Sequence, residues 1–154
     1  MSTNEHQLPE QGFLESLTNE ERGALQGLGE ELSFNEGETV IEEAAAQDHL
    51  YVLLTGRCKV LQKHVAPAVT AWLEEGDSFG EVNLFDLEEA GASASVQAAG
   101  SIVVWRIDRN GLNTFIGSQP EASLRLMIGI ATLLSRRLRS VNELVRKMSV
   151  WTRS

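Results

Sequence analysis

The 154-residue chain has few of the residues that would mark a secreted or membrane protein. Its single cysteine, Cys58, cannot form an internal disulfide, which fits a reducing compartment. Because Cys58 lies in an alternating, strand-like run, we expect a buried and unreactive thiol. No apolar run reaches the roughly 18 residues of a membrane span, and the polar start "MSTNEHQLPEQG" is no secretory or transit peptide. These absences predict a cytoplasmic protein.

Residues for metal binding and for nucleophilic catalysis are equally sparse. His6, His49 and His64 lack the HxH and HExxH spacings of zinc and iron sites, so we expect no metal. The chain has no G-x-S-x-G nucleophile elbow, and Ser93 and Ser95 have no histidine nearby in the sequence. A metal-dependent enzyme is therefore disfavoured, and the expectation is a protein that is not an enzyme.

Charge is distributed unevenly along the chain, whose net charge is −9. Residues 1–120 carry 6 Lys and Arg against 20 Asp and Glu, whereas residues 121–154 carry 7 against 2. The acidic body argues against nucleic acid as the main partner, because phosphate binding needs a basic face. The basic end is either a solvated helix face or a contact for another protein.

The pattern of apolar residues predicts short helices first and then many strands. Thr18 followed by Glu21 has the spacing of a capping box and predicts a short helix, preceded by a single turn. From Leu32 to Asp108, short alternating runs are separated by turns that contain glycine. This arrangement predicts an α+β protein that is mainly β, an antiparallel β-roll (jelly-roll-like, a double-stranded β-helix) with short N-terminal helices.

A long helix is expected to follow the β-roll, because Pro120 suits a first helical turn and the apolar residues then recur at intervals of three and four. The spacing is that of a heptad seam, and about 25 residues of helix span close to 38 Å, more than a small roll covers. We therefore predict a homodimer, although a helix packed wholly on its own core is the alternative. The predicted interface residues are Met127, Ala131, Leu134, Leu138, Val141, Val145 and Met148.

The predicted organisation is one domain between two short ends. Residues 1–12 are expected to be flexible, 13–148 to form the domain, and 149–154 to form a tail. Within the domain, the β-roll should occupy about 30–107 and the C-terminal helix about 120–148.

One segment has the composition of a ligand cradle. Residues 76–84 read "GDSFGEVNL", and "GASASVQA" follows at 91–98. Phe79–Gly80–Glu81 at a strand-to-helix transition would present backbone N–H groups and one carboxylate to a cavity. The carboxylate accepts hydrogen bonds from hydroxyls, and N–H groups at a helix start favour a phosphate.

These two stretches resemble the phosphate-binding cassette of the cyclic-nucleotide-binding domains, the family of the catabolite activator protein and of protein kinase A regulatory subunits. The order of "FLESLTNEE", "FNEGETVIEE", "DHLYVLLTGRCKV" and the long helix is similar too. The resemblance implies that Glu81 binds the ribose 2′-hydroxyl of cAMP or cGMP, and that the cassette N–H groups line the sugar–phosphate. The ligand-binding residues it implies are Phe79, Gly80, Glu81, Val82, Ser93 and Ala94.

The cassette departs from the family at its strongest contact. Ala92 stands where the family has an arginine that pairs with the cyclic phosphate, while Ser93 is retained. Losing a charge-assisted hydrogen bond costs about 1.5–3 kcal/mol, roughly 10- to 150-fold in affinity. Arg136 or Arg137 of the last helix is the open alternative source of that charge. A second departure is Ala44, where the family often has glycine.

The expectation is a stand-alone, homodimeric regulatory or sensor module with weak or altered ligand binding, which signals through a partner protein. The predicted partner contact is the basic helix face with Trp151 beyond it. Because the chain ends at "SVWTRS" without room for a helix-turn-helix, we expect no direct DNA binding. The alternatives are ordinary binding of cAMP, cGMP or a cyclic dinucleotide, and a sensor fragment of a transcription regulator. The basic face comprises Arg136, Arg137, Arg139, Arg146 and Lys147.

Overall fold

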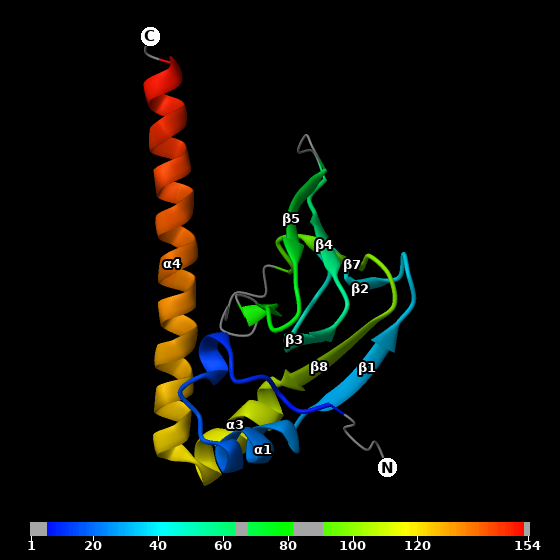
Figure 1. Cartoon of the computed structure of the whole chain (residues 1–154), viewed down its shortest axis with the longest axis vertical. Coiled ribbons are helices and arrows are strands. Elements are labelled where there is room, and N and C mark those ends of the chain that lie inside the picture. The colour runs from blue at the N-terminus through cyan, green and yellow to red at the C-terminus, as the bar shows by residue number, and fades with distance from the viewer. Residues whose placement is uncertain (1–5, 64–67, 82–90, 153–154) are drawn as a thin grey trace.

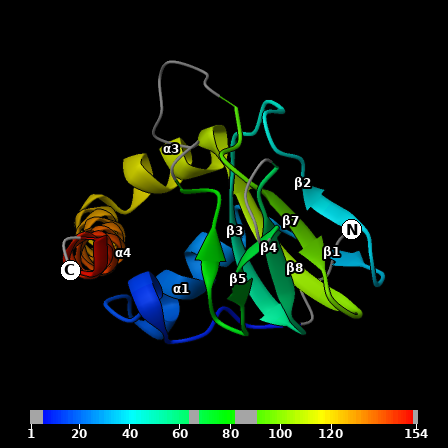
Figure 2. The same cartoon turned by 90° about the horizontal axis from the view of Figure 1, so that it is seen from above.

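Two antiparallel sheets of four strands form the β-roll in the computed structural model, which describes residues 6–63, 68–81 and 91–152. Figure 1 shows the roll with the long helix α4 beside it, and Figure 2 shows α1, α3 and α4 on one side of the sheets. The first sheet has the order β1 (Glu30–Phe34), β8 (Ile102–Asp108), β3 (His49–Thr55), β6 (Ser78–Phe79). The second has the order β2 (Thr39–Ile41), β7 (Ser95–Ala98), β4 (Cys58–Leu61), β5 (Val69–Leu73).

The tight turns predicted from glycine join strands of different sheets. The turn through Gly37 leads from β1 to β2, and the turn at Gly56 leads from β3 to β4. At Gly56 the backbone has φ +89°, and a Cβ atom would lie 2.6 Å from the carbonyl oxygen of Ser101. These reversals cross from one sheet to the other and so make a roll, whereas β4 and β5 pair as antiparallel neighbours within the second sheet.

Strand β3 is buried on both faces and separates two apolar clusters. Leu50 and Val52 pack on the helical side with residues such as Phe115, whereas Leu53 packs between the sheets with Cys58. Burial raises the pKa of the Cys58 thiol to about 11, so the expectation of a buried, unreactive cysteine is confirmed.

The helices begin where the sequence places their caps. In α1 (Asn19–Gln26), Thr18 Oγ1 accepts from the Glu21 N–H at 3.1 Å and the Thr18 N–H donates to Glu21 Oε1 at 2.8 Å. This confirms the capping box. Asp108 caps α3 (Arg109–Ser118) through Gly111, and α4 runs from Pro120 to Thr152. The long helix thus continues four residues past the predicted end at 148.

The N-terminal segment is packed where composition predicted flexibility. Within the described residues 6–12, Leu8 is buried in the core cluster and its N–H donates to Gln26 Oε1 at 2.9 Å. The His6 N–H donates to Glu31 Oε1 at 2.8 Å. One apolar side chain and two side-chain acceptors thus connect this polar segment to the body, and the flexibility expected of residues 1–12 stays a prediction. A short 3-10 helix, η1 (Gly12–Leu14), follows.

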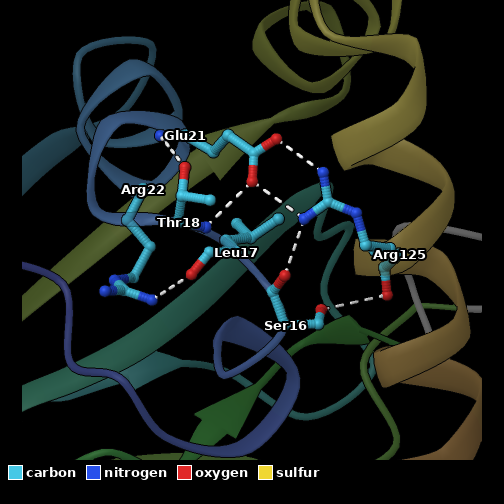
Figure 3. Close-up of polar contacts among 6 residues, drawn as sticks. All are labelled: Ser16, Leu17, Thr18, Glu21, Arg22 and Arg125. Atoms are coloured by element: carbon cyan, nitrogen blue, oxygen red, sulfur yellow. Dashed lines mark hydrogen bonds and ion pairs between the residues drawn. The ribbon is translucent and has the colours of Figure 1, made fainter.

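An ion pair clamps the base of α4 to the N-terminal segment (Figure 3). Arg125 donates to both carboxylate oxygens of Glu21, at 2.8 and 2.6 Å, and to the carbonyl oxygen of Ser16 at 2.7 Å. The Arg125 side chain, followed by the Thr18 N–H, lowers the pKa of Glu21 to about 2. A bidentate, charge-assisted contact of this kind fixes geometry as well as adding energy. The first turns of α4 are thereby fixed on the body.

No helix in the described part of the chain is both long enough and apolar enough to cross a membrane.

Candidate ligand-binding site

The first half of the cassette turns sharply directly after β6. Phe79 pairs with Tyr51 of β3, and the two rings stack with centroids 4.8 Å apart. At Gly80 the backbone has φ +83°, and a Cβ atom would lie 2.5 Å from the carbonyl oxygen of His49. Only glycine fits such a position without strain. This turn places the next residue, Glu81, in the interior, where its side chain is 4% exposed.

The second half of the cassette is held against the turn at residues 44–45. The Ala92 N–H donates to the Ala45 carbonyl at 3.0 Å, and the Ala44 N–H donates to the Ala92 carbonyl at 2.8 Å. Ala92 itself is buried. Ala44 has φ +68°, a left-handed conformation that favours glycine. Alanine at position 44, where the resemblance implies glycine, therefore has a strained backbone.

Replacing Ala44 by glycine should stabilise the protein. The left-handed conformation costs alanine about 1–2 kcal/mol, while glycine loses about 0.4–1 kcal/mol more entropy on folding. The net gain is about 0.5–1 kcal/mol, a rise in Tm of about 2 °C that thermal unfolding can measure. Ala45→Gly is the matched control and should lower the Tm, because Ala45 does not share the left-handed conformation. A fall in Tm for Ala44→Gly would contradict the account of strain.

A pocket of about 630 Å³ lies between the two cassette segments, the second sheet and α4. All the predicted ligand-binding residues that the structure describes line this pocket, and Ala92 lines it too. Val82 lies outside the described residues. Their role in binding stays a prediction. The cassette residues that line the pocket are Phe79, Gly80, Glu81, Ala92, Ser93 and Ala94.

The carboxylate of Glu81 meets an arginine from the long helix. Arg137 Nη1 donates to Glu81 Oε1, and Arg137 Nη2 donates to the carbonyl oxygen of Ser78 at 3.1 Å. Among the described residues, no partner contacts the other carboxylate oxygen, Oε2, which is buried. Partial burial lowers the pKa of the Arg137 guanidinium, against an opposing effect of Asp77. Within the described part of the chain, Glu81 thus keeps one acceptor without a partner, and the side chain of Arg137 stays 43% exposed.

Sequence reasoning left Arg136 and Arg137 as alternatives, and the structure places only Arg137 at this pocket. Arg136 lies with Arg125 along a separate groove beside η1. Residues 81 and 137 are 56 positions apart, and no local pattern links them. Among the described residues, no group of three or more His, Cys, Asp or Glu side chains is placed to hold a metal.

The predicted dimer seam divides into two parts along α4. Met127 and Leu134 are partly buried against the core of their own chain. From Ser135 to Ser149 every residue is exposed, including Leu138 at 62% and Met148 at 60%. The first part of the seam therefore also packs inward, and the second part is an exposed apolar stripe, of which Val141 also lines the pocket. Figure 1 shows this end of α4 extending past the β-roll.

Comparison with known proteins decides the family. A sequence model described as "Cyclic nucleotide-binding domain" matches residues 31–119, which is more than half of the chain. The chain belongs to the cyclic-nucleotide-binding domain family. This match confirms the resemblance in the sequence, and the two sheets with the long C-terminal helix confirm the predicted α+β roll.

Curated relatives of this cyclic-nucleotide-binding domain are regulatory proteins. The "cAMP-dependent protein kinase regulatory subunit" of Aspergillus fumigatus is 33% identical over 110 residues, 71% of this chain and 26% of that protein. The "CRP-like cAMP-activated global transcriptional regulator" of Mycobacterium tuberculosis is 30% identical over 115 residues, 72% of this chain and 48% of that protein. The chain thus spans about a quarter to a half of the length of these relatives.

Solved structures share the fold of this cyclic-nucleotide-binding domain. The catabolite activator protein of Thermus thermophilus superposes with a TM-score of 0.77 and 23% identity, over 89% of this chain and 62% of that one. A cyclic nucleotide-binding domain from Methylobacillus flagellatus superposes with a TM-score of 0.76 and 21% identity, over 84% of this chain and 72% of that one. At these identities the likeness concerns the architecture alone.

Proposed function

We propose that this chain is a non-enzymatic regulatory module that binds a cyclic nucleotide weakly, because its cassette has Ala92 in place of the phosphate-binding arginine. The observation that carries the proposal is the buried Glu81, which lines a pocket of about 630 Å³ and whose Oε2 atom has no partner among the described residues. A buried acceptor without a partner costs about 1–3 kcal/mol. A ligand hydroxyl that donates to Glu81 would remove this cost.

The volume and lining of the pocket suit a nucleotide of the family's kind. Apolar side chains such as Val60, Leu73 and Val96 line it together with the polar groups of Ser78 and Glu81. An apolar pocket with a few convergent polar groups is typical of small-molecule sites. The names of the curated relatives, a kinase regulatory subunit and a cAMP-activated regulator, support cAMP as the first ligand to test.

The output of the module would pass through α4. A second copy of the chain would cover the exposed apolar residues between Leu138 and Met148 and so form a homodimer. A partner protein would bind the exposed basic residues of the same helix, Arg139, Arg146 and Lys147. Arg137 is no longer counted in the predicted basic face, because its guanidinium is paired with Glu81. The side chain of Trp151, also predicted at this contact, lies outside those that the structure describes.

Calorimetric titration of the purified protein with cAMP and cGMP tests this proposal, with cyclic dinucleotides as a further series. We expect measurable binding with a Kd weaker than about 1 μM. Glu81→Gln should abolish the binding, whereas Glu36→Gln, in an exposed turn, should not change it. Binding of cAMP at nanomolar Kd, or equal binding by the Glu81→Gln variant, would contradict the proposal.

A further inference from the structure

Arg137 is the one positive charge at the pocket. Among the described residues that line it, Asp77 and Glu81 are acidic, and no cation other than Arg137 is present. The contacts to Glu81 and Ser78 use two of the five N–H donors of its guanidinium. The side chain of Arg137 remains 43% exposed, so a ligand in the pocket can reach it.

The residue at position 92 cannot supply such a charge. Ala92 lines the same pocket as Arg137 but ends at Cβ, and the Ser93 beside it offers only a neutral hydroxyl. An anionic group in this pocket would therefore find its strongest available partner on α4. A guanidinium binds phosphate through paired, charge-assisted hydrogen bonds, which are about twice as strong as neutral ones.

We infer that Arg137 is the anion-binding residue of this pocket, and that its ligand combines hydroxyl groups with a phosphate, as a phosphorylated ribose does. On binding, the phosphate takes N–H donors of Arg137, and a ribose hydroxyl donates to Glu81. Arg137 must share or give up its bond to Glu81, and this cost lowers the net affinity. The inference rests on the proposed function and adds the residue that recognises the charge.

The pair of Arg137 and Glu81 also connects the ligand pocket to α4. Arg125 fixes the base of the helix on the N-terminal segment, while Arg137, twelve residues further on, joins it to the cassette. The exposed apolar stripe begins at the next residue, Leu138. A ligand that changes the partner of Arg137 therefore acts next to the start of the exposed apolar stripe.

The test compares Arg137→Gln with Arg139→Gln, a matched loss of one positive charge at an exposed position of the same helix. Binding of a fluorescent cAMP analogue gives the reference affinity, and cAMP and adenosine are measured as competitors. We expect Arg137→Gln to weaken cAMP by about 10-fold or more, as for loss of a charge-assisted contact. Adenosine keeps the free 2′-hydroxyl of cAMP and lacks the phosphate, so its affinity as a competitor should change less than twofold. Arg139→Gln should leave the affinities for both cAMP and adenosine unchanged.

The outcomes separate this inference from the proposed function. If the wild-type protein binds no cyclic nucleotide, the proposed function fails, and the inference fails with it. If wild type binds cAMP and Arg137→Gln binds it equally well, only the inference is overturned. Tighter binding by Arg137→Gln also overturns it, because Arg137 would then block the site. An equal loss for cAMP and adenosine would assign Arg137 to holding the pocket's shape and overturn its role toward the phosphate.

Discussion

Ala92→Arg should raise the affinity for cAMP by about 10- to 150-fold, the gain from one charge-assisted contact of about 1.5–3 kcal/mol. Ala92 lines the pocket, and Arg137 is the one cationic residue among the described residues that line it. A guanidinium at position 92 would therefore give the phosphate a second charged partner. The added arginine needs no exchange of partners with Glu81. Calorimetric titration of the variant and of wild type measures the difference.

Two controls accompany this substitution. Ala92→Gln adds a shorter polar side chain without the charge, and it should leave the affinity within about threefold of wild type. Because Ala92 is buried, the thermal unfolding of both variants must be measured to establish that they fold. An Ala92→Arg variant that folds and binds no better than wild type would show that the missing arginine does not limit binding.

Leu138→Glu should convert the predicted dimer to a monomer. Leu138 is 62% exposed in the single chain, so the substitution removes no core contact. In a dimer it would bury one unpaired carboxylate from each copy, at a combined cost of at least about 4 kcal/mol. This cost weakens association by about 1,000-fold. Sedimentation or light scattering over a range of concentrations gives the association constant.

Lys147→Glu is the matched control for this substitution. Lys147 is exposed and lies nine residues along the helix, about two and a half turns, which places it on the opposite side of α4. It should leave the dimer intact. A wild-type protein that is monomeric at micromolar concentration would contradict the dimer, as would a Leu138→Glu variant that still dimerises.

Local features of this protein were predictable because their partners are close in sequence. The capping box joins Thr18 to Glu21, and Asp108 caps a helix three residues ahead of Gly111, so spacing alone identifies both. The alternating apolar residues of the strands and the glycine turns likewise predicted a β-roll. The burial of Leu8 in the core cluster, in contrast, has no local pattern that announces it, because the residues around it are far away in the sequence.

The choice between Arg136 and Arg137 shows the limit of such reasoning. Both stand on the same helix with the same charge, and neither has a sequence pattern that links it to Glu81. Which of them reaches the pocket depends on the rotation of α4 about its axis. That rotation is set by contacts such as Arg125 with Glu21, which lie 104 residues apart in the chain.

The sequence by itself determined the family, the β-roll and the long helix. The residues involved are local runs whose side-chain period and turn chemistry do not depend on distant neighbours. The tertiary structure alone decided which strands pair and which arginine meets Glu81. Side-chain periodicity tells which face of an element is buried, but only the packing of distant segments determines what that face contacts.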